Sequence, residues 1–150
     1  MIISLCVLAS AVAALELRSD GGTFDLVVYG ATPAGFSAAI AASKADSSLR
    51  IALVEPTNYI GGMAGPGGIG LRDFAIQELT NGTALEWALR NGAHYGKSDP
   101  VWQPDFAIGN ASFWAMMLAR ENLVVAMNQP LDDGAHNGGV TVDGTRVTSI

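Results

Sequence analysis

The stretch Asp25-Leu-Val-Val-Tyr-Gly-Ala-Thr-Pro-Ala-Gly35, followed by Arg50-Ile-Ala-Leu-Val-Glu55, decides the fold of this chain. Its first apolar run stops at Gly30, and a helix rich in small residues is predicted to begin at once. A second apolar run ends on Glu55, 25 positions after Gly30. This order of strand, glycine turn, helix, strand and acid is the fingerprint of a dinucleotide-binding β–α–β unit in an α/β fold.

Each part of the fingerprint has a chemical reason. Gly30 permits the unusual backbone angles of the turn, and Gly35 lets the helix pack closely on the strand. The first N–H groups of the helix, with its positive dipole end, are expected to face a pyrophosphate. Glu55 is expected to accept hydrogen bonds from ribose hydroxyls and to repel a 2′-phosphate, which disfavours NADP. The residues of this turn predicted to bind the nucleotide are Gly30, Ala31, Thr32, Pro33, Ala34 and Gly35, of which Gly30, Thr32, Ala34 and Gly35 are predicted to hold the pyrophosphate by backbone contacts.

One position departs from the usual pattern. Thr32 stands where the middle glycine normally lets the backbone approach the pyrophosphate, although its hydroxyl can donate to a phosphate oxygen. Pro33 suits the first turn of a helix, where its missing N–H costs no helical bond. The alternative is a β–α–β unit that packs without binding a nucleotide. The common register of Gly30, Gly35 and Glu55 favours binding.

A second glycine motif follows the acid. The segment Glu55-Pro-Thr-Asn-Tyr-Ile-Gly-Gly-Met63 opens a loop with six glycines in residues 61–70. Such a loop is too flexible for a helix or strand interior, and the alternative to a binding role is a surface connector. A Gly-Gly pair just beyond the ribose-binding acid resembles the second FAD motif of glutathione-reductase-type flavoproteins.

Together, the two motifs resemble those of the FAD-dependent oxidoreductase family of two-domain flavoproteins. Members often carry threonine at the middle glycine, so Thr32 is a family trait. The resemblance covers residues 23–150, is strongest before Asp73, and implies a Rossmann-like domain with non-covalent FAD and redox chemistry through the isoalloxazine ring. We expect Gly61, Gly62 and Met63 to run along the FAD diphosphate and ribose, with residues 65–72 nearer the flavin, and Pro56 to be a further cofactor-binding residue. Later segments that follow the family's order are Trp102, Pro104, Met116 to Leu118, Asn122 to Val125, and Asp143 to Val147.

The remaining elements are predicted from periodicity and turn residues. We expect strands at 25–29, buried on both faces, at 51–54 and at 123–127. We expect a hairpin of 140–142 and 146–150 around Asp143-Gly144. Helices are expected at 34–45, at 83–91 (capped by Asn81 or Thr83 and ended by Gly92), and at 112–122.

The length, composition and net charge of the chain restrict its number of domains and the kind of partner it binds. A chain of 150 residues with 49% hydrophobic residues suits one folded domain, and a net charge of −6 argues against a nucleic-acid partner. The chain stops inside the second strand of the hairpin, so we expect residues 23–150 to be the N-terminal part of an FAD-binding domain. Its partner would be a small-molecule substrate. Two alternatives remain open: a fragment of an NAD-dependent dehydrogenase, which leaves Gly61-Gly62 unexplained, and an inactive nucleotide-binding module.

The N-terminal residues have a separate character. Residues 2–15 form an apolar run of 14 residues, shorter than the roughly 20 needed to span a bilayer. We expect a signal peptide over residues 1–14 and a mature protein in the secretory lumen or outside the cell, without a membrane anchor. The alternative is a buried N-terminal strand or helix. Two acceptor sequons, at Asn81 and Asn110, agree with secretion, and the single cysteine, Cys6, lies inside the apolar run.

Other candidate residues are assigned structural roles. His94 and His136 lack metal-ligand spacing, so no metal site is expected. Tryptophans 87, 102 and 114 are expected to pack in the core rather than border a flavin. Asp132-Asp133 is interpreted as a solvated turn, and no catalytic acid, base or nucleophile is assigned.

Overall fold

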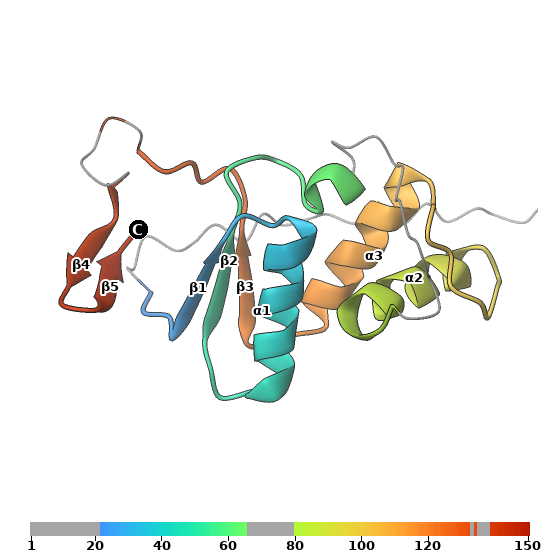
Figure 1. The fold of residues 1–150 in the computed structure, drawn as a ribbon, viewed down its shortest axis with the longest axis horizontal. Helices are drawn as coiled ribbons and strands as arrows, with labels where there is room; N and C mark the ends of the chain where they lie inside the picture. Colours follow the sequence, from blue (N-terminus) through green and yellow to red (C-terminus); the bar gives the residue numbers. More distant parts are fainter. Residues whose placement is uncertain (1–21, 66–79, 133, 135–138) are drawn as a thin grey trace, which may run out of the picture.

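The structure is a computed structural model that describes residues 22–65, 80–132, 134 and 139–150. A parallel sheet with the strand order β1-β2-β3 lies beside helices, and a separate antiparallel hairpin follows (Figure 1). The sheet strands are β1 (Leu26–Tyr29), β2 (Ile51–Val54) and β3 (Leu123–Ala126). The other elements are α1 (Pro33–Ala45), η1 (Gly62–Ala64), α2 (Gly82–His94), α3 (Phe106–Leu118), β4 (Thr141–Asp143) and β5 (Arg146–Ser149). This confirms the predicted α/β class with a parallel, Rossmann-like sheet.

The two faces of the sheet have different surroundings. β2 lies in the centre and all four of its residues are buried. Alternate residues of the strands point to opposite faces, and one set packs in the hydrophobic core with the helices. That set comprises Val28, Ile51, Leu53, Leu123 and Val125. The other set lines a groove against the hairpin and comprises Val27, Tyr29, Ala52, Val54 and Val124.

The expectation that the first strand is buried on both faces is wrong for the described residues. Leu26 and Val27 are each 36% exposed and Tyr29 is 39% exposed. The physical reason is that β1 is an edge strand whose second face lines the open groove. An unbroken apolar run does not reveal the strand's position in the sheet.

Helix α1 begins one residue earlier than expected and ends at Ala45, as expected. Thr32 is the N-cap and Pro33 occupies the first helical position. Phe36 is buried and its ring meets the edge of Phe113 at 4.8 Å between centroids. Phe113 stacks on Trp87 at 5.1 Å, so aromatic side chains join α1, α2 and α3. Tryptophans 87 and 102 are buried in this core, and Trp114 packs partly buried against it.

The predicted end of the second helix is wrong. Asn81 is its N-cap, as expected, but the helix continues through Gly92 to His94. Gly92 is buried, and a Cβ there would lie 2.1 Å from the carbonyl oxygen of Asp99. This glycine is therefore needed for a close approach of two chain segments, and not for stopping the helix.

The predicted bounds of the third helix, 112–122, are also wrong, because α3 begins at Phe106 and ends at Leu118. Its early turns contain Gly109, whose carbonyl accepts a hydrogen bond of 3.0 Å from Trp87 Nε1. At the other end, Asn122 Nδ2 donates to the carbonyl of Leu49 at 2.9 Å, which holds the chain in a loop before β3. The start and the end of α3 therefore both differ from the expected residues because of contacts with segments distant in sequence.

The strands were predicted more closely. β2 has the expected bounds, β1, β3 and β5 are each one residue shorter than expected at one end, and β4 is shifted by one residue at both ends. The predicted turn at Asp143-Gly144 is wrong by one residue, because Asp143 pairs with Arg146 at the end of β4 and Gly144 and Thr145 form the connection. None of the helices in the described ranges has the length and apolar character of a membrane span.

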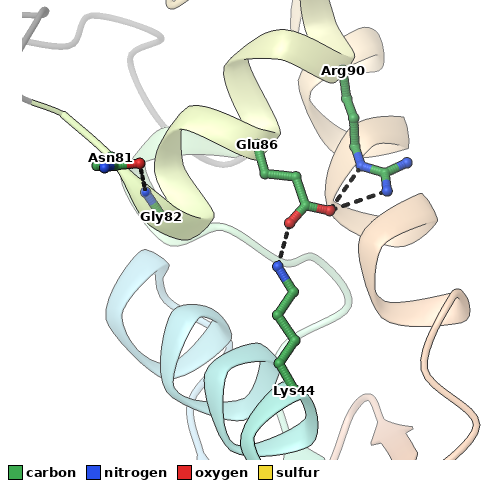
Figure 2. Close-up of polar contacts among 5 residues, drawn as sticks. All are labelled: Lys44, Asn81, Gly82, Glu86 and Arg90. Carbon is green, nitrogen blue, oxygen red and sulfur yellow. Dashed lines mark hydrogen bonds and ion pairs between the residues drawn. The ribbon is translucent and has the colours of Figure 1, made fainter.

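An ion-pair cluster of Lys44, Glu86 and Arg90 joins α1 to α2 (Figure 2). Lys44 on α1 forms an ion pair with Glu86 on α2, and Arg90 pairs with the same carboxylate from one helical turn further along. Burial raises the pKa of Glu86, but the hydrogen bonds from Lys44 and Arg90 outweigh burial and hold that pKa below its ordinary value of 4.5. The ionised form is therefore favoured in the folded protein.

This ion pair predicts a pH dependence of stability. Because the pKa of Glu86 is lower in the folded state, its contribution is complete above about pH 4.5 and is lost as the pH falls through the folded-state pKa. We expect Glu86→Gln to flatten the fall in unfolding free energy on acidification, as measured by urea unfolding at several pH values. Gln103→Glu, which changes the net charge by one unit at an exposed position, is the control. An unchanged acid slope in Glu86→Gln would contradict the assignment.

Candidate dinucleotide site

The three parallel strands end level with one another, which brings their following loops to one edge. Tyr29 pairs with Val54, and Val54 pairs with Ala126. Backbone hydrogen bonds continue the ladder beyond the strands, from Gly30 N to Val54 O at 2.7 Å and from Glu55 N to Ala126 O at 2.8 Å. The carboxyl edge of such a sheet is where α/β folds bind nucleotides.

The glycines of the first turn are required for two different reasons. Gly30 has a φ of 93°, a conformation that glycine adopts without steric cost. Gly35 has no unusual backbone angle, but a Cβ on it would lie 2.0 Å from the carbonyl oxygen of Gly30. Helix α1 can therefore approach the end of β1 only with glycine at position 35.

The N-terminus of α1 presents backbone N–H groups at this edge. Thr32 Oγ1 accepts a hydrogen bond from Gly35 N at 3.3 Å, and Thr32 O accepts one from Phe36 N at 2.8 Å. In the described part of the chain, the N–H groups of Thr32 and Ala34 have no acceptor. Residues 32–34 are also exposed. Unpaired N–H groups at an exposed helix N-terminus fit a pyrophosphate.

The carboxylate of Glu55 lies beneath the first turn. The residue is 7% exposed. Its Oε2 accepts from Ala31 N at 2.6 Å, and its Oε1 accepts from both Thr57 N at 2.9 Å and Thr57 Oγ1 at 2.6 Å. Glu55 therefore connects the loop after β1 to the loop after β2, a role that sequence reasoning did not predict.

The Gly-Gly motif lies beside the first turn. Gly61 N donates to the carbonyl of Ala31 at 2.7 Å, and Gly61 has a φ of 88°. A Cβ on Gly62 would lie 3.7 Å from Thr32 Cα. Met63 follows with an exposed fraction of 72%. Two glycine motifs that are 30 residues apart thus form one surface, while residues 66–72 of the predicted loop lie outside the described residues.

The structure brings most of the predicted site residues to one edge of the sheet. Residues 30–35, Glu55, Pro56 and 61–63 all follow the carboxyl ends of β1 and β2. Thr57 was missed, although a threonine two positions after an acid is able to hydrogen-bond back to it. No cluster of three or more metal-ligating side chains occurs in the described residues, and His136 and Asp133 lie outside them.

A parallel sheet with a glycine turn, a helix N-terminus and an acid at its carboxyl edge defines a dinucleotide-binding domain of the Rossmann type. Residues 25–150 match the FAD dependent oxidoreductase family, and the chain belongs to this family. The cofactor of the family is FAD. No curated protein matches the chain closely enough to be counted as a relative.

Proposed function

We propose that residues 23–150 form the N-terminal part of the FAD-binding domain of a flavin-dependent oxidoreductase with a small-molecule substrate. The observation that carries this proposal is the surface made by the first glycine turn, Glu55 and Gly61-Gly62. The Gly61 N–H donates to the carbonyl of Ala31, which joins the second glycine motif to the first. These residues would bind the ADP half of FAD, and this half would anchor the cofactor to the protein.

Each residue of the site has a proposed role. The free N–H groups of Thr32 and Ala34 would bind the pyrophosphate, and Glu55 would accept a hydrogen bond from the adenosine ribose. Gly62, whose Cβ would face Thr32, would leave room for the diphosphate, whereas glycine at position 61 lets the loop pack on Phe113, since a Cβ there would lie 2.5 Å from Phe113 Cε2. Pro56 and Met63 would border the nucleotide. When bound, the isoalloxazine ring of FAD supplies the redox chemistry, and the chain supplies binding and orientation.

Two alternatives are distinguishable by experiment. An NAD-dependent dehydrogenase would use the same first turn and acid, and an inactive module would bind either nucleotide without turnover. The family match and the position of Gly61-Gly62 favour FAD. Titration of FAD and of NAD into one sample of protein, followed by calorimetry, would separate the FAD protein from the NAD-dependent dehydrogenase, and reduction of the bound flavin by a substrate would separate an enzyme from an inactive module.

The direct test is FAD retention. We expect the purified chain, mixed with FAD and passed through gel filtration, to elute with the visible absorption band of a bound flavin. Ala38→Ser on the exposed side of α1 serves as a control that should retain FAD equally. Elution without a flavin band, while circular dichroism shows a folded protein, would overturn the proposal.

We further propose that residues 1–14 are a signal peptide and that the mature protein is a secreted or lumenal glycoprotein modified at Asn81. Asn81 is exposed just before α2, and its side-chain oxygen accepts from Gly82 N (Figure 2). A glycan on its Nδ2 leaves that bond intact. Asn110 lies within α3 with a buried Oδ1, and Ser112 of its sequon is fully buried.

Expression in a eukaryotic secretory host tests this proposal. The native chain should reach the medium or the lumen with a glycosidase-sensitive mobility shift. Asn81→Gln should remove the shift, whereas Asn110→Gln should leave it unchanged. Retention of an unshifted chain in the cytosol would refute the localisation, and loss of the shift only in Asn110→Gln would refute the choice of site.

A further inference from the structure

The acceptor capacity of Glu55 is limited by its own neighbours. A carboxylate has about four lone-pair positions, two on each oxygen. Thr57 N and Thr57 Oγ1 both donate to Oε1, and Ala31 N donates to Oε2. Oε1 is therefore filled, and one position remains on Oε2. A ribose offers two hydroxyls, so both cannot bind this carboxylate while Thr57 keeps its contacts.

The Thr57 hydroxyl is held firmly toward the carboxylate. Its oxygen lies 2.6 Å from Glu55 Oε1 and 3.1 Å from the carbonyl of Tyr59. A hydroxyl carries a single hydrogen, and the shorter contact to a charged acceptor is the stronger one. The Thr57 carbonyl also accepts from Asn128 N at 2.9 Å, which ties this loop to the end of β3. The residue is therefore fixed through its side chain and its backbone.

We infer that Thr57 is a positioning residue that restricts Glu55 to a single hydroxyl of the adenosine ribose. The restriction makes the remaining position on Oε2, next to the Ala31 N–H and the first glycine turn, the only ribose acceptor of this carboxylate. This inference rests on the proposed function, in which Glu55 holds the ribose. It adds the residue that sets how many hydroxyls the site recognises.

The test compares ADP with 2′-deoxy-ADP and 3′-deoxy-ADP on the flavin-free native chain by calorimetry. We expect one analogue to bind about tenfold more weakly than ADP, the scale for one lost hydrogen bond to a charged group, and the other to bind as tightly as ADP. In Thr57→Ala, which removes the donor and opens space beside Oε1, both analogues should bind about tenfold more weakly than ADP.

Two further variants keep the position beside Oε1 occupied in different ways, and both should behave like the native chain. Thr57→Ser keeps the donor and should reproduce the native pattern. Thr57→Val keeps the volume without the donor, so its methyl group still blocks Oε1 and one analogue alone should be weakened. Circular dichroism checks that each variant is folded, and the comparison on the native chain needs no variant.

Each outcome decides the inference. If both analogues bind more weakly to the native chain, Thr57 does not restrict Glu55 and the inference is wrong, while the ribose assignment stands. The inference is also wrong if Thr57→Ala still discriminates a single hydroxyl. If neither analogue differs from ADP in any variant, or ADP does not bind, the proposed role of Glu55 itself fails.

Discussion

Replacement of Gly35 by alanine is expected to abolish FAD retention and to lower the free energy of unfolding by about 3 kcal/mol or more. The added Cβ would lie 2.0 Å from the carbonyl oxygen of Gly30 and 3.4 Å from Val28 Cγ1. The nearest atom belongs to the backbone, so no side-chain rotation relieves the clash. Helix α1 would have to move away from β1, which also displaces the N–H groups proposed to bind the pyrophosphate.

Gly30→Ala is the matched control for this effect. A Cβ on Gly30 would meet no atom within 4 Å, but its φ of 93° is unfavourable for alanine. We expect a loss of about 1–2 kcal/mol from backbone strain alone. Urea unfolding followed by fluorescence of the buried Trp87 and Trp102 measures both variants. Equal destabilisation by the two substitutions would show that close packing at Gly35 is not the dominant requirement.

Glu55→Ala is expected to have the second largest effect, on both stability and binding. It leaves the buried N–H group of Ala31 and the partly buried N–H group of Thr57 without their acceptor. We expect the free energy of unfolding to fall by about 3 kcal/mol, and FAD retention to weaken by about 1–3 kcal/mol from the lost ribose contact. Thermal unfolding without FAD and equilibrium dialysis with FAD measure the two effects separately.

Two variants sharpen this prediction. Glu55→Gln keeps the shape and one carbonyl oxygen for Ala31 N, but it places an amide donor against the Thr57 N–H, so we expect an intermediate loss. Glu121→Ala removes an exposed glutamate and should change neither quantity. If Glu55→Ala lowers stability but leaves FAD affinity unchanged, the ribose is held by another group and Glu55 serves only to join the two loops.

The β–α–β unit was predictable because its signals are local. Thr32 and Pro33 begin the helix through contacts within one turn, and the apolar run of β2 ends where a buried strand meets a polar loop. The bounds of α3 were not predictable in this way. Gly109 lies inside the helix because Trp87 packs against it, with 3.2 Å between Trp87 Cζ2 and the position of an added Cβ. That contact crosses 22 residues of sequence.

The exposure of β1 was not predictable from local sequence signals either. Both β1 and β2 are short runs of mainly apolar residues, yet the two strands differ in burial because one lies at an edge of the sheet and the other at its centre. Strand order is a property of the assembled sheet. A hydrophobic run records the tendency to be buried, but the neighbours that bury it come from elsewhere in the chain.

Residue types and their spacing were enough to predict the dinucleotide fingerprint, the order of the first strands and helix, and the resemblance to a family that binds FAD. These depend on residue types at short, fixed spacings, where backbone conformation and capping act locally. Only the tertiary structure placed Gly61-Gly62 against the first turn and filled Oε1 of Glu55 with the two donors of Thr57. Hydrogen-bond geometry at the site depends on how the loops at the carboxyl edge of the sheet meet, and a linear spacing does not contain that information.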